Sequence, residues 1–281
     1  MKNKIKELTT FTIIIILFIY ILNNTPYITK QVVYSIEIWI TKIIPTLFPT
    51  FILVDLINNS NIPYYLNKYF KINYLYILSI ISGSPSNAYI INKYNTNKTK
   101  LIAVTKYTSL IFTITHLTKI FNKSIAITLI ALNIISNLIL IIITKPPNIE
   151  YKKEKQQPLS SLILNSIKNN INTIITILGT IIFINILPIE KIDNTYIKAL
   201  LFSITEITTS LNYLTTINIA TNIKLLITII SLSTCGLCIE LQIKSIINDA
   251  SINYKQYIKY RLIHLIIFLI LSIPILFHIQ N

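Results

Sequence analysis

Four acidic residues lie in or beside strongly apolar stretches of the 281-residue chain: Glu37, Asp55, Glu206 and Glu240. An ionisable side chain inside the hydrocarbon of a bilayer is costly, so each of them is a candidate for binding chemistry. Glu206 is the sharpest candidate, because it lies in Thr-Glu-Ile-Thr-Thr-Ser (205–210) with hydroxyl groups on both sides. A carboxylate surrounded by hydroxyl oxygens can hold a cation or a hydrogen-bonding solute.

These acids also have purely structural interpretations, and the sequence leaves both open. A buried Glu206 is equally well satisfied by Lys106, by Lys198 or by backbone N–H groups of an interrupted helix. Glu37 and Asp55 are expected at the membrane interface.

The segment Cys-Gly-Leu-Cys (235–238) has the spacing of a redox dithiol or of half a zinc site. The chain has no second cysteine pair, and no histidine lies near this one. We therefore interpret the two cysteines as small apolar residues around a glycine. Glu240 and Gln242 follow directly, and a polar pair just past a helix interruption can face a cavity.

Enzymatic chemistry is not expected. The chain has only three glycines, which lie far apart in the sequence and exclude a glycine-rich phosphate-binding loop. Its three histidines form no paired metal-binding motif. We predict no catalytic residue, no metal site and no cofactor.

The composition indicates a membrane protein. Hydrophobic residues make up 53% of the chain and charged residues 12%, against roughly 25% charged residues in soluble domains. A spanning helix needs about 20 mostly apolar residues, so the chain could supply on the order of seven. We predict an all-α, polytopic integral membrane helical bundle, located in the cell membrane as a multi-pass protein.

The net charge of +15 would suit a nucleic-acid partner in a soluble protein. Here the basic residues gather at the ends of apolar segments, as in cytoplasmic loops, so no nucleic-acid partner is expected. The Lys- and Pro-rich residues 145–158 predict a cytoplasmic linker between an N-terminal membrane half (1–144) and a C-terminal membrane half (159–281).

Further elements follow from hydropathy and its interruptions. In segment 31–57, Pro45 and Pro49 predict either a simple kinked helix or a helix that lines a cavity. The other expected elements are an uncleaved N-terminal span, spans at 101–119, 124–143, 171–188 and 256–279, and an interfacial amphipathic helix at 159–172. The stretch 196–214 contains ITEITTS, which is polar for a span.

Two segments, 74–94 and 224–247, carry turn-forming residues within apolar sequence and are predicted to be broken or re-entrant. Residues 78–90 can be laid over 227–239 with a shared I-I-S-x-S, which indicates a two-half internal repeat, although chance can also give so short a match. Corresponding interrupted helices point to a transporter-type binding site near the bilayer midplane. The candidate site residues are Gly83, Ser84, Pro85, Ser86, Asn87, Glu206, Thr208, Thr209, Thr234, Gly236 and Gln242.

Five segments share residues and order with one known family. They are Trp39 with IPTLFPTF (44–51), SGSPSNA (82–88), TEITTS (205–210), STCGLCIELQ (233–242) and YIKYRLIH (257–264). Over roughly residues 30–280 the chain thereby resembles the YlbJ-type sporulation integral membrane proteins, within the nucleoside-recognition (Gate domain) group. It departs from the family pattern at Asn87 and Ser210, where the family has glycine, and at Thr234-Cys235, where it has Phe-Gly.

The resemblance implies a membrane protein of endospore formation, in the mother-cell or forespore membrane. Its core is expected to be transporter-like and to bind or move a small polar, nucleoside-like solute. The alternative is a non-transporting membrane scaffold for sporulation partners. Besides the solute, the expected partners are the lipid bilayer and further copies of the chain in a homo-oligomer.

Overall fold

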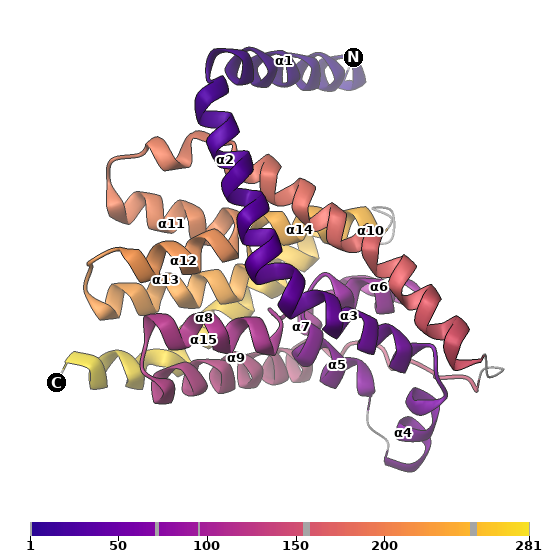
Figure 1. Cartoon of the computed structure of the whole chain (residues 1–281). Helices are drawn as coiled ribbons and strands as arrows, with labels where there is room; N and C mark the ends of the chain where they lie inside the picture. Colours follow the sequence, from indigo (N-terminus) through magenta and orange to yellow (C-terminus); the bar gives the residue numbers. More distant parts are fainter. Residues whose placement is uncertain (1, 71–72, 95, 154–157, 248–251, 281) are drawn as a thin grey trace.

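Every element in the part of the chain that the structure describes is helical, which confirms the predicted all-α bundle (Figure 1). The computed structural model describes residues 2–70, 73–94, 96–153, 158–247 and 252–280. The elements are α1 (Lys2–Asn23), α2 (Thr25–Ile38), the π-helical turn η1 (Trp39–Ile43), α3 (Ile44–Asn58), α4 (Ile62–Phe70), α5 (Tyr74–Ser82), α6 (Ser86–Asn92), α7 (Lys98–Thr105), α8 (Leu110–Ile120), α9 (Lys123–Thr144), α10 (Leu159–Asn185), the 3-10 turn η2 (Pro188–Lys191), α11 (Thr195–Thr205), α12 (Ile207–Thr216), α13 (Thr221–Thr234), α14 (Gly236–Ile246) and α15 (Tyr254–Gln280).

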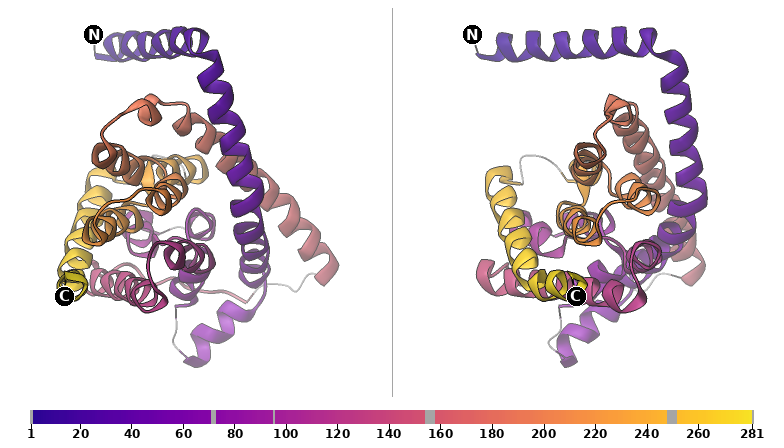
Figure 2. Two further views of the ribbon diagram at one scale, coloured as in Figure 1. Left: turned by 60° about the vertical axis from the view of Figure 1, so that its left-hand side comes forward. Right: turned by 90° about the vertical axis from the view of Figure 1, so that its left-hand side faces the viewer.

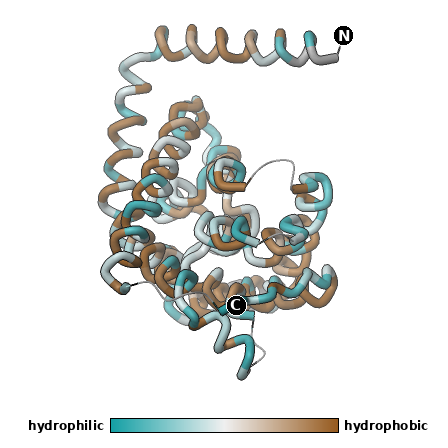
Figure 3. The backbone as a smooth tube through the Cα atoms, turned by 90° about the vertical axis from the view of Figure 1, so that its right-hand side faces the viewer, coloured by the Kyte–Doolittle hydropathy of each residue, from teal (hydrophilic) through white to brown (hydrophobic). Residues whose placement is uncertain are grey.

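Within the described ranges, five helical segments are long and apolar enough to cross a membrane, which suggests a multi-pass membrane protein. Large apolar side chains such as Leu53, Ile142 and Ile266 are exposed on their surfaces, and Figure 3 shows apolar residues along most of the helices. Such an exterior suits hydrocarbon, in which helices satisfy their own backbone groups. The five segments are Thr25–Asn58, Lys123–Thr144, Leu159–Lys191, Thr221–Ile246 and Tyr254–Leu276.

The predicted interruption in segment 74–94 is a re-entrant hairpin, made of α5 and α6. The chain turns at Gly83, and α6 packs back against α5. The hydroxyl oxygens of Tyr74 and Tyr94, at the open end of the hairpin, lie 3.2 Å apart. The segment therefore enters and leaves the bundle at the same end.

The next two helices, α7 and α8, form a broken span. Both pack against the single long helix α9, so they follow one another along its length. Between them the chain is extended from Lys106, and the Tyr107 carbonyl accepts the Ser84 N–H at 2.8 Å. The first hairpin tip thus bonds to a carbonyl that a continuous helix would have used itself. For this reason the prediction of one unbroken span over 101–119 is wrong.

A second hairpin follows in the C-terminal half, where α11 and α12 fold back on each other around Glu206. The rings of Phe202 and Tyr213, on opposite arms, have centroids 5.4 Å apart. The stretch 196–214, which is polar for a span, is therefore a hairpin and not a single crossing. Glu206 is extended (φ −148, ψ 114), so one residue ends α11 and begins α12 without any glycine or proline.

The second broken span consists of α13 and α14, so the predicted interruption in 224–247 is confirmed. Cys235 (φ 56) and Gly236 (φ 79) both adopt left-handed backbone conformations at the break. The final helix, α15, then packs along α9, the last long helix of the N-terminal half.

The two halves thus repeat one order of elements: hairpin, broken span, long helix. Each hairpin packs against the broken span of the other half, α6 against α14 and α12 against α8. The predicted overlay of 78–90 on 227–239 is wrong in register, because it pairs the first hairpin with the second broken span. The shared I-I-S-x-S reflects composition, since the two segments fold differently.

The two hairpins open at opposite ends of the bundle. At one end, which we call the linker end, the Tyr151 hydroxyl donates to Asn73 at 2.5 Å and Asn92 donates to the Ile246 carbonyl at 3.0 Å. At the far end, Tyr27 donates to the Leu187 carbonyl at 3.0 Å. The first hairpin opens at the linker end, and the second follows η2 at the far end (Figure 1). Figure 2 views the bundle from two further sides, so that several helices are seen end-on.

Two further elements differ from prediction. The interfacial helix at 159–172 and the span at 171–188 are one continuous helix, α10, because no helix-breaking residue separates them. The predicted linker is packed rather than free in its first part, since Ile149 and Tyr151 are buried in the core; residues 154–157 of this linker lie outside the described residues.

Candidate functional site

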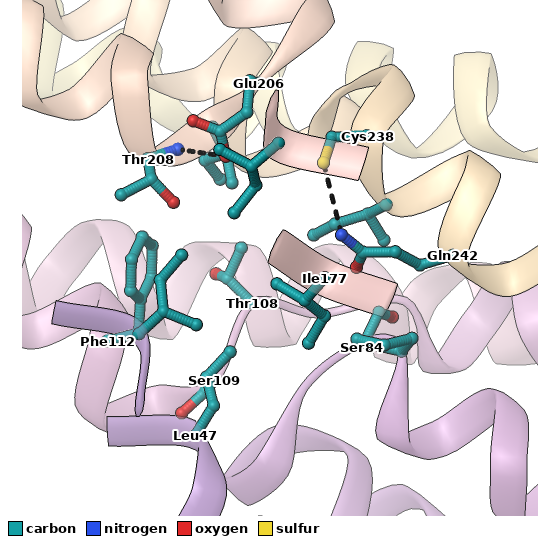
Figure 4. A pocket seen from close by; sticks show the side chains of 15 residues that line it. Leu47, Ser84, Thr108, Ser109, Phe112, Ile177, Glu206, Thr208, Cys238 and Gln242 are labelled. Atoms are coloured by element: carbon teal, nitrogen blue, oxygen red, sulfur yellow. Dashed lines mark hydrogen bonds between the residues drawn. The ribbon is translucent and has the colours of Figure 1, made fainter. Parts of the chain in front are cut away.

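A small cavity of about 40 Å³ lies where the two hairpin tips approach the two broken spans (Figure 4). We call it the central cavity. It would hold on the order of three water molecules. Its lining residues are Ile43, Leu47, Ser84, Pro85, Thr108, Ser109, Phe112, Ile177, Ile181, Glu206, Ile207, Thr208, Cys238, Ile239 and Gln242.

Glu206 forms the tip of the second hairpin and is 2% exposed. Its carboxylate accepts the N–H of Thr208 at 2.9 Å and that of Thr209 at 2.5 Å. Helix N-termini favour negative charge, so the start of α12 is a suitable position for this side chain, which caps the helix. Among the described residues Glu206 forms no ion pair, since the salt bridges there join other acids to lysines.

Two hydroxyl groups in the central cavity have no partner. The Ser84 and Ser109 side-chain oxygens are buried and form no hydrogen bond within the described chain. An unpaired buried hydroxyl costs about 1–3 kcal/mol, and such groups are rare unless water or a ligand satisfies them. One comes from the first hairpin and one from the first broken span, so the unsatisfied polarity lies where the two elements meet.

The opposite wall of the central cavity is contributed by α14 and α10. Gln242 donates to the Thr180 hydroxyl at 2.8 Å, which fixes the amide beside the cavity. Cys238 is a free thiol on the same wall, 3.3 Å from the Thr180 hydroxyl. The other cysteine, Cys235, is likewise free and buried in the core, so the pair forms no disulfide in this structure.

The long segment Thr25–Asn58 also reaches this site. A π-helical turn at Trp39–Ile43 precedes Pro45 and leaves the helix continuous through it. Ile43 and Leu47 line the central cavity, so of the two interpretations of the prolines, the cavity-lining helix fits the geometry. Single π turns inside α-helices frequently accompany functional sites.

A larger cavity of about 480 Å³, which we call the far-end vestibule, lies beyond the first turn of α12. Thr208 faces the central cavity, whereas its neighbour Thr209 faces the vestibule. The Thr209 hydroxyl donates to the Asn185 amide oxygen at 3.2 Å, and Lys42 donates to Asn212 at 2.7 Å. The N-terminal turn of α12, held by Glu206, is thus the wall between the two cavities.

Not all of the predicted site residues meet at one place. Ser84, Pro85, Glu206, Thr208 and Gln242 line the central cavity, while Thr209 lines the vestibule. The remaining predicted residues serve other contacts. Gly83 packs against the backbone of Thr108 and Ser109, and Asn87 donates to Thr105. Ser86 lines a small cavity beside Asp55, while Thr234 and Gly236 face the opposite side of α14.

Lys106, which the sequence analysis considered as a partner of Glu206, pairs with Glu240 instead. Its ammonium group contacts the Glu240 carboxylate and the Thr234 carbonyl, so it does not neutralise Glu206. Arg261, which was not among the predicted residues, donates to the carbonyls of Ala103 and Ser233 at 2.8 and 2.5 Å. The two cations therefore lie at the C-terminal ends of α7 and α13, where helix dipoles favour positive charge.

Thr108 and Ser109 are the site residues that sequence reasoning missed. They lie in a run without glycine or proline, and the only signal there was the charged Lys106 inside an apolar stretch.

The chain matches no known protein-family model, and comparisons with curated proteins and with solved structures give no match either.

Proposed function

We propose that the chain is a transporter-like membrane protein that binds a small polar solute between its two hairpin tips and exposes it alternately to each side. The observation that carries the proposal is the central cavity. It brings Glu206, a buried carboxylate without an ion-pair partner among the described residues, together with the unsatisfied hydroxyls of Ser84 and Ser109. A dry scaffold would gain nothing from the two unsatisfied hydroxyls.

The repeated, oppositely directed hairpins support the same proposal. Transporters of this general kind hold their substrate near the midplane at discontinuous helices, and rocking of one half against the other gives access. Here the tip of each hairpin lies against a broken span, so movement of a hairpin would open the central cavity toward the end at which that hairpin enters.

We propose that the solute lies partly outside the central cavity in the arrangement seen here, because that cavity is small. A volume of about 40 Å³ is too small for a nucleoside-sized molecule, whereas the far-end vestibule, at about 480 Å³, lies in the range of small-molecule sites. We infer that the solute is admitted at the vestibule and that the first turn of α12 must shift before it reaches Ser84 and Ser109.

The resemblance to YlbJ-type proteins supports a nucleoside-like solute and a role in endospore formation, in the mother-cell or forespore membrane. The matching segments include the first hairpin tip (82–88) and the second (205–210), which are the two elements that face each other across the central cavity.

The test is uptake of labelled nucleosides and other small polar solutes by proteoliposomes that contain the purified full chain. We expect uptake of at least one solute, reduced about tenfold or more in Glu206→Gln, because a charge-assisted hydrogen bond is lost. Glu37→Gln, at an exposed position, is the matched control and should leave uptake unchanged.

Folding of each variant is checked by its elution as a single species in detergent. If the native protein takes up and binds no solute, or if Glu206→Gln behaves like Glu37→Gln, the proposal fails and the scaffold alternative gains.

A further inference from the structure

A second cavity, of about 420 Å³, lies on the other side of α14 from the central cavity. We call it the lateral cavity. Its apolar wall includes Leu237 on α14 and Ile258 and Leu262 on α15, all of which are more than half exposed. The cavity is therefore open toward the surface that hydrocarbon would cover.

The polar part of the lateral cavity carries an excess of positive charge. Three cations, Lys106, Lys244 and Arg261, line it against one acid, Glu240. That acid is already engaged, since it contacts Lys106 and accepts the Tyr257 hydroxyl at 2.7 Å. A further anion in the cavity would thus meet net positive charge rather than a balanced pair.

Arg261 adds positive charge at the deep end of the cavity that no acid there balances. It is 8% exposed, and its Nε atom is buried without a hydrogen-bond partner in the described chain. Its terminal nitrogens bond to the Ala103 and Ser233 carbonyls and to the Asn137 amide oxygen, which are all neutral acceptors. The guanidinium charge therefore has no carboxylate partner there.

Lys244 is placed to receive an anionic headgroup. It is exposed in the last turn of α14, toward the linker end, with its ammonium group 4.4 Å from the centre of the Tyr254 ring. Eight residues separate it from Gly236 at the deep end of the cavity, which is about 12 Å of helix. The lateral cavity is thus an apolar slot with the Lys244 cation at its outer end.

We propose that the lateral cavity binds an anionic phospholipid from the leaflet at the linker end. One acyl chain lies along Leu237, Ile258 and Leu262, and the phosphate lies beside Lys244. The bound lipid packs against the break between α13 and α14, so it stabilises the closed position of α14. This inference does not depend on solute transport.

The experiment measures the lipid retained by the purified full chain. The protein is loaded with equal amounts of phosphatidylglycerol and phosphatidylcholine of identical chains, washed in mild detergent and analysed by mass spectrometry. We expect phosphatidylglycerol to be retained about fivefold over phosphatidylcholine. Lys244→Gln should bring this ratio close to one, and Leu262→Trp, which fills the slot, should reduce retention of both lipids.

The matched controls are Lys259→Gln and Ile266→Trp, which alter exposed positions of α15 outside the lateral cavity; both should behave like the native chain. All four substitutions are at exposed positions, so folding should be preserved.

Equal retention of the two lipids by the native chain would overturn the proposal. Equal losses in Lys244→Gln and Lys259→Gln would also overturn it, because they would indicate only an effect of general surface charge. Displacement by chain-free glycerol phosphate as effectively as by phosphatidylglycerol would show a soluble-anion site instead.

Discussion

A β-carbon on Gly83 would lie 2.3 Å from the backbone nitrogen of Ser109, so the first hairpin tip is seated directly in the break of the first broken span. The C-terminal half has the reciprocal contact, because a β-carbon on Gly236, in the second broken span, would lie 2.8 Å from the Thr205 carbonyl oxygen at the second hairpin tip. One glycine lies in a hairpin and the other in a broken span. Each permits backbone-to-backbone contact at the edge of the site.

We predict that Gly83→Ala prevents stable folding. The backbone of Gly83 (φ 73, ψ −171) is in a region that is open essentially to glycine alone, at a cost of roughly 1–3 kcal/mol for other residues, and the collision with Ser109 adds to it. The measurement is the yield of monodisperse protein in detergent, with its thermal unfolding midpoint. Gly179→Ala is the control, since a β-carbon there has no atom within 4 Å; equal yields for the two variants would contradict the tight seating of the tip.

A second prediction concerns the ion pair between Lys106 and Glu240, which joins the two broken spans. Lys106 is 1% exposed, so Lys106→Met should destabilise the protein by about 3 kcal/mol, because it leaves Glu240 and the Thr234 carbonyl without their cation. Combining it with Glu240→Gln should recover part of the loss. The measurement is a double-mutant cycle of unfolding midpoints, and strictly additive effects would show that the two side chains are not coupled.

Of the four helix breaks, only those marked by glycine or proline could be predicted from the sequence. The interruptions at Gly83 and at Gly236 were predictable, because glycine and proline mark breaks in apolar sequence. The break at 106–109 and the turn at Glu206 have no such mark. The break at 106–109 goes with a tertiary contact, the Ser84 N–H bonded to the Tyr107 carbonyl. The turn at Glu206 goes with a local cap, in which the Glu206 carboxylate accepts the first N–H groups of α12.

The residues of the central cavity also differ in whether the sequence identifies them. Glu206 was identifiable from sequence, since a carboxylate in an apolar segment is costly wherever it lies. Ser109 was not, because serine and threonine are abundant in this chain and only the fold brings this one opposite Ser84. The register of the internal repeat could not be predicted from the sequence either. Hairpins and broken spans are similar in composition and differ only in whether the second helix turns back.

A third prediction tests the packed part of the linker. The Tyr151 hydroxyl donates to Asn73 and its ring centroid lies 4.5 Å from that of Tyr74, at the open end of the first hairpin. Tyr151→Phe should cost about 1 kcal/mol through the lost hydrogen bond, and Tyr151→Ala about 3 kcal/mol through the lost ring. Thermal unfolding measures both, with Tyr69→Phe, at an exposed position, as the control.

The same contact predicts a pH dependence. Burial raises the pKa of the Tyr151 hydroxyl above its ordinary value, so the neutral, donating form is favoured in the folded chain. Its contribution to stability is therefore complete below about pH 10 and is lost as the pH rises further. Tyr151→Phe should remove that part of the alkaline loss, and an unchanged alkaline profile would exclude Tyr151 as its source.

A fourth prediction uses the two native cysteines to report on the central cavity. Cys238 lines the cavity, whereas Cys235 is buried in the core behind the break. In Cys235→Ala, a small thiol reagent should label Cys238 slowly, because this side chain is only 1% exposed, and a solute bound in the cavity should slow labelling further. The reciprocal variant, Cys238→Ala, leaves Cys235 as the control and should remain unlabelled until the protein unfolds. Faster labelling of Cys235 than of Cys238 would contradict the orientation of α14, since that helix could not then present Cys238 to the space between the hairpin tips.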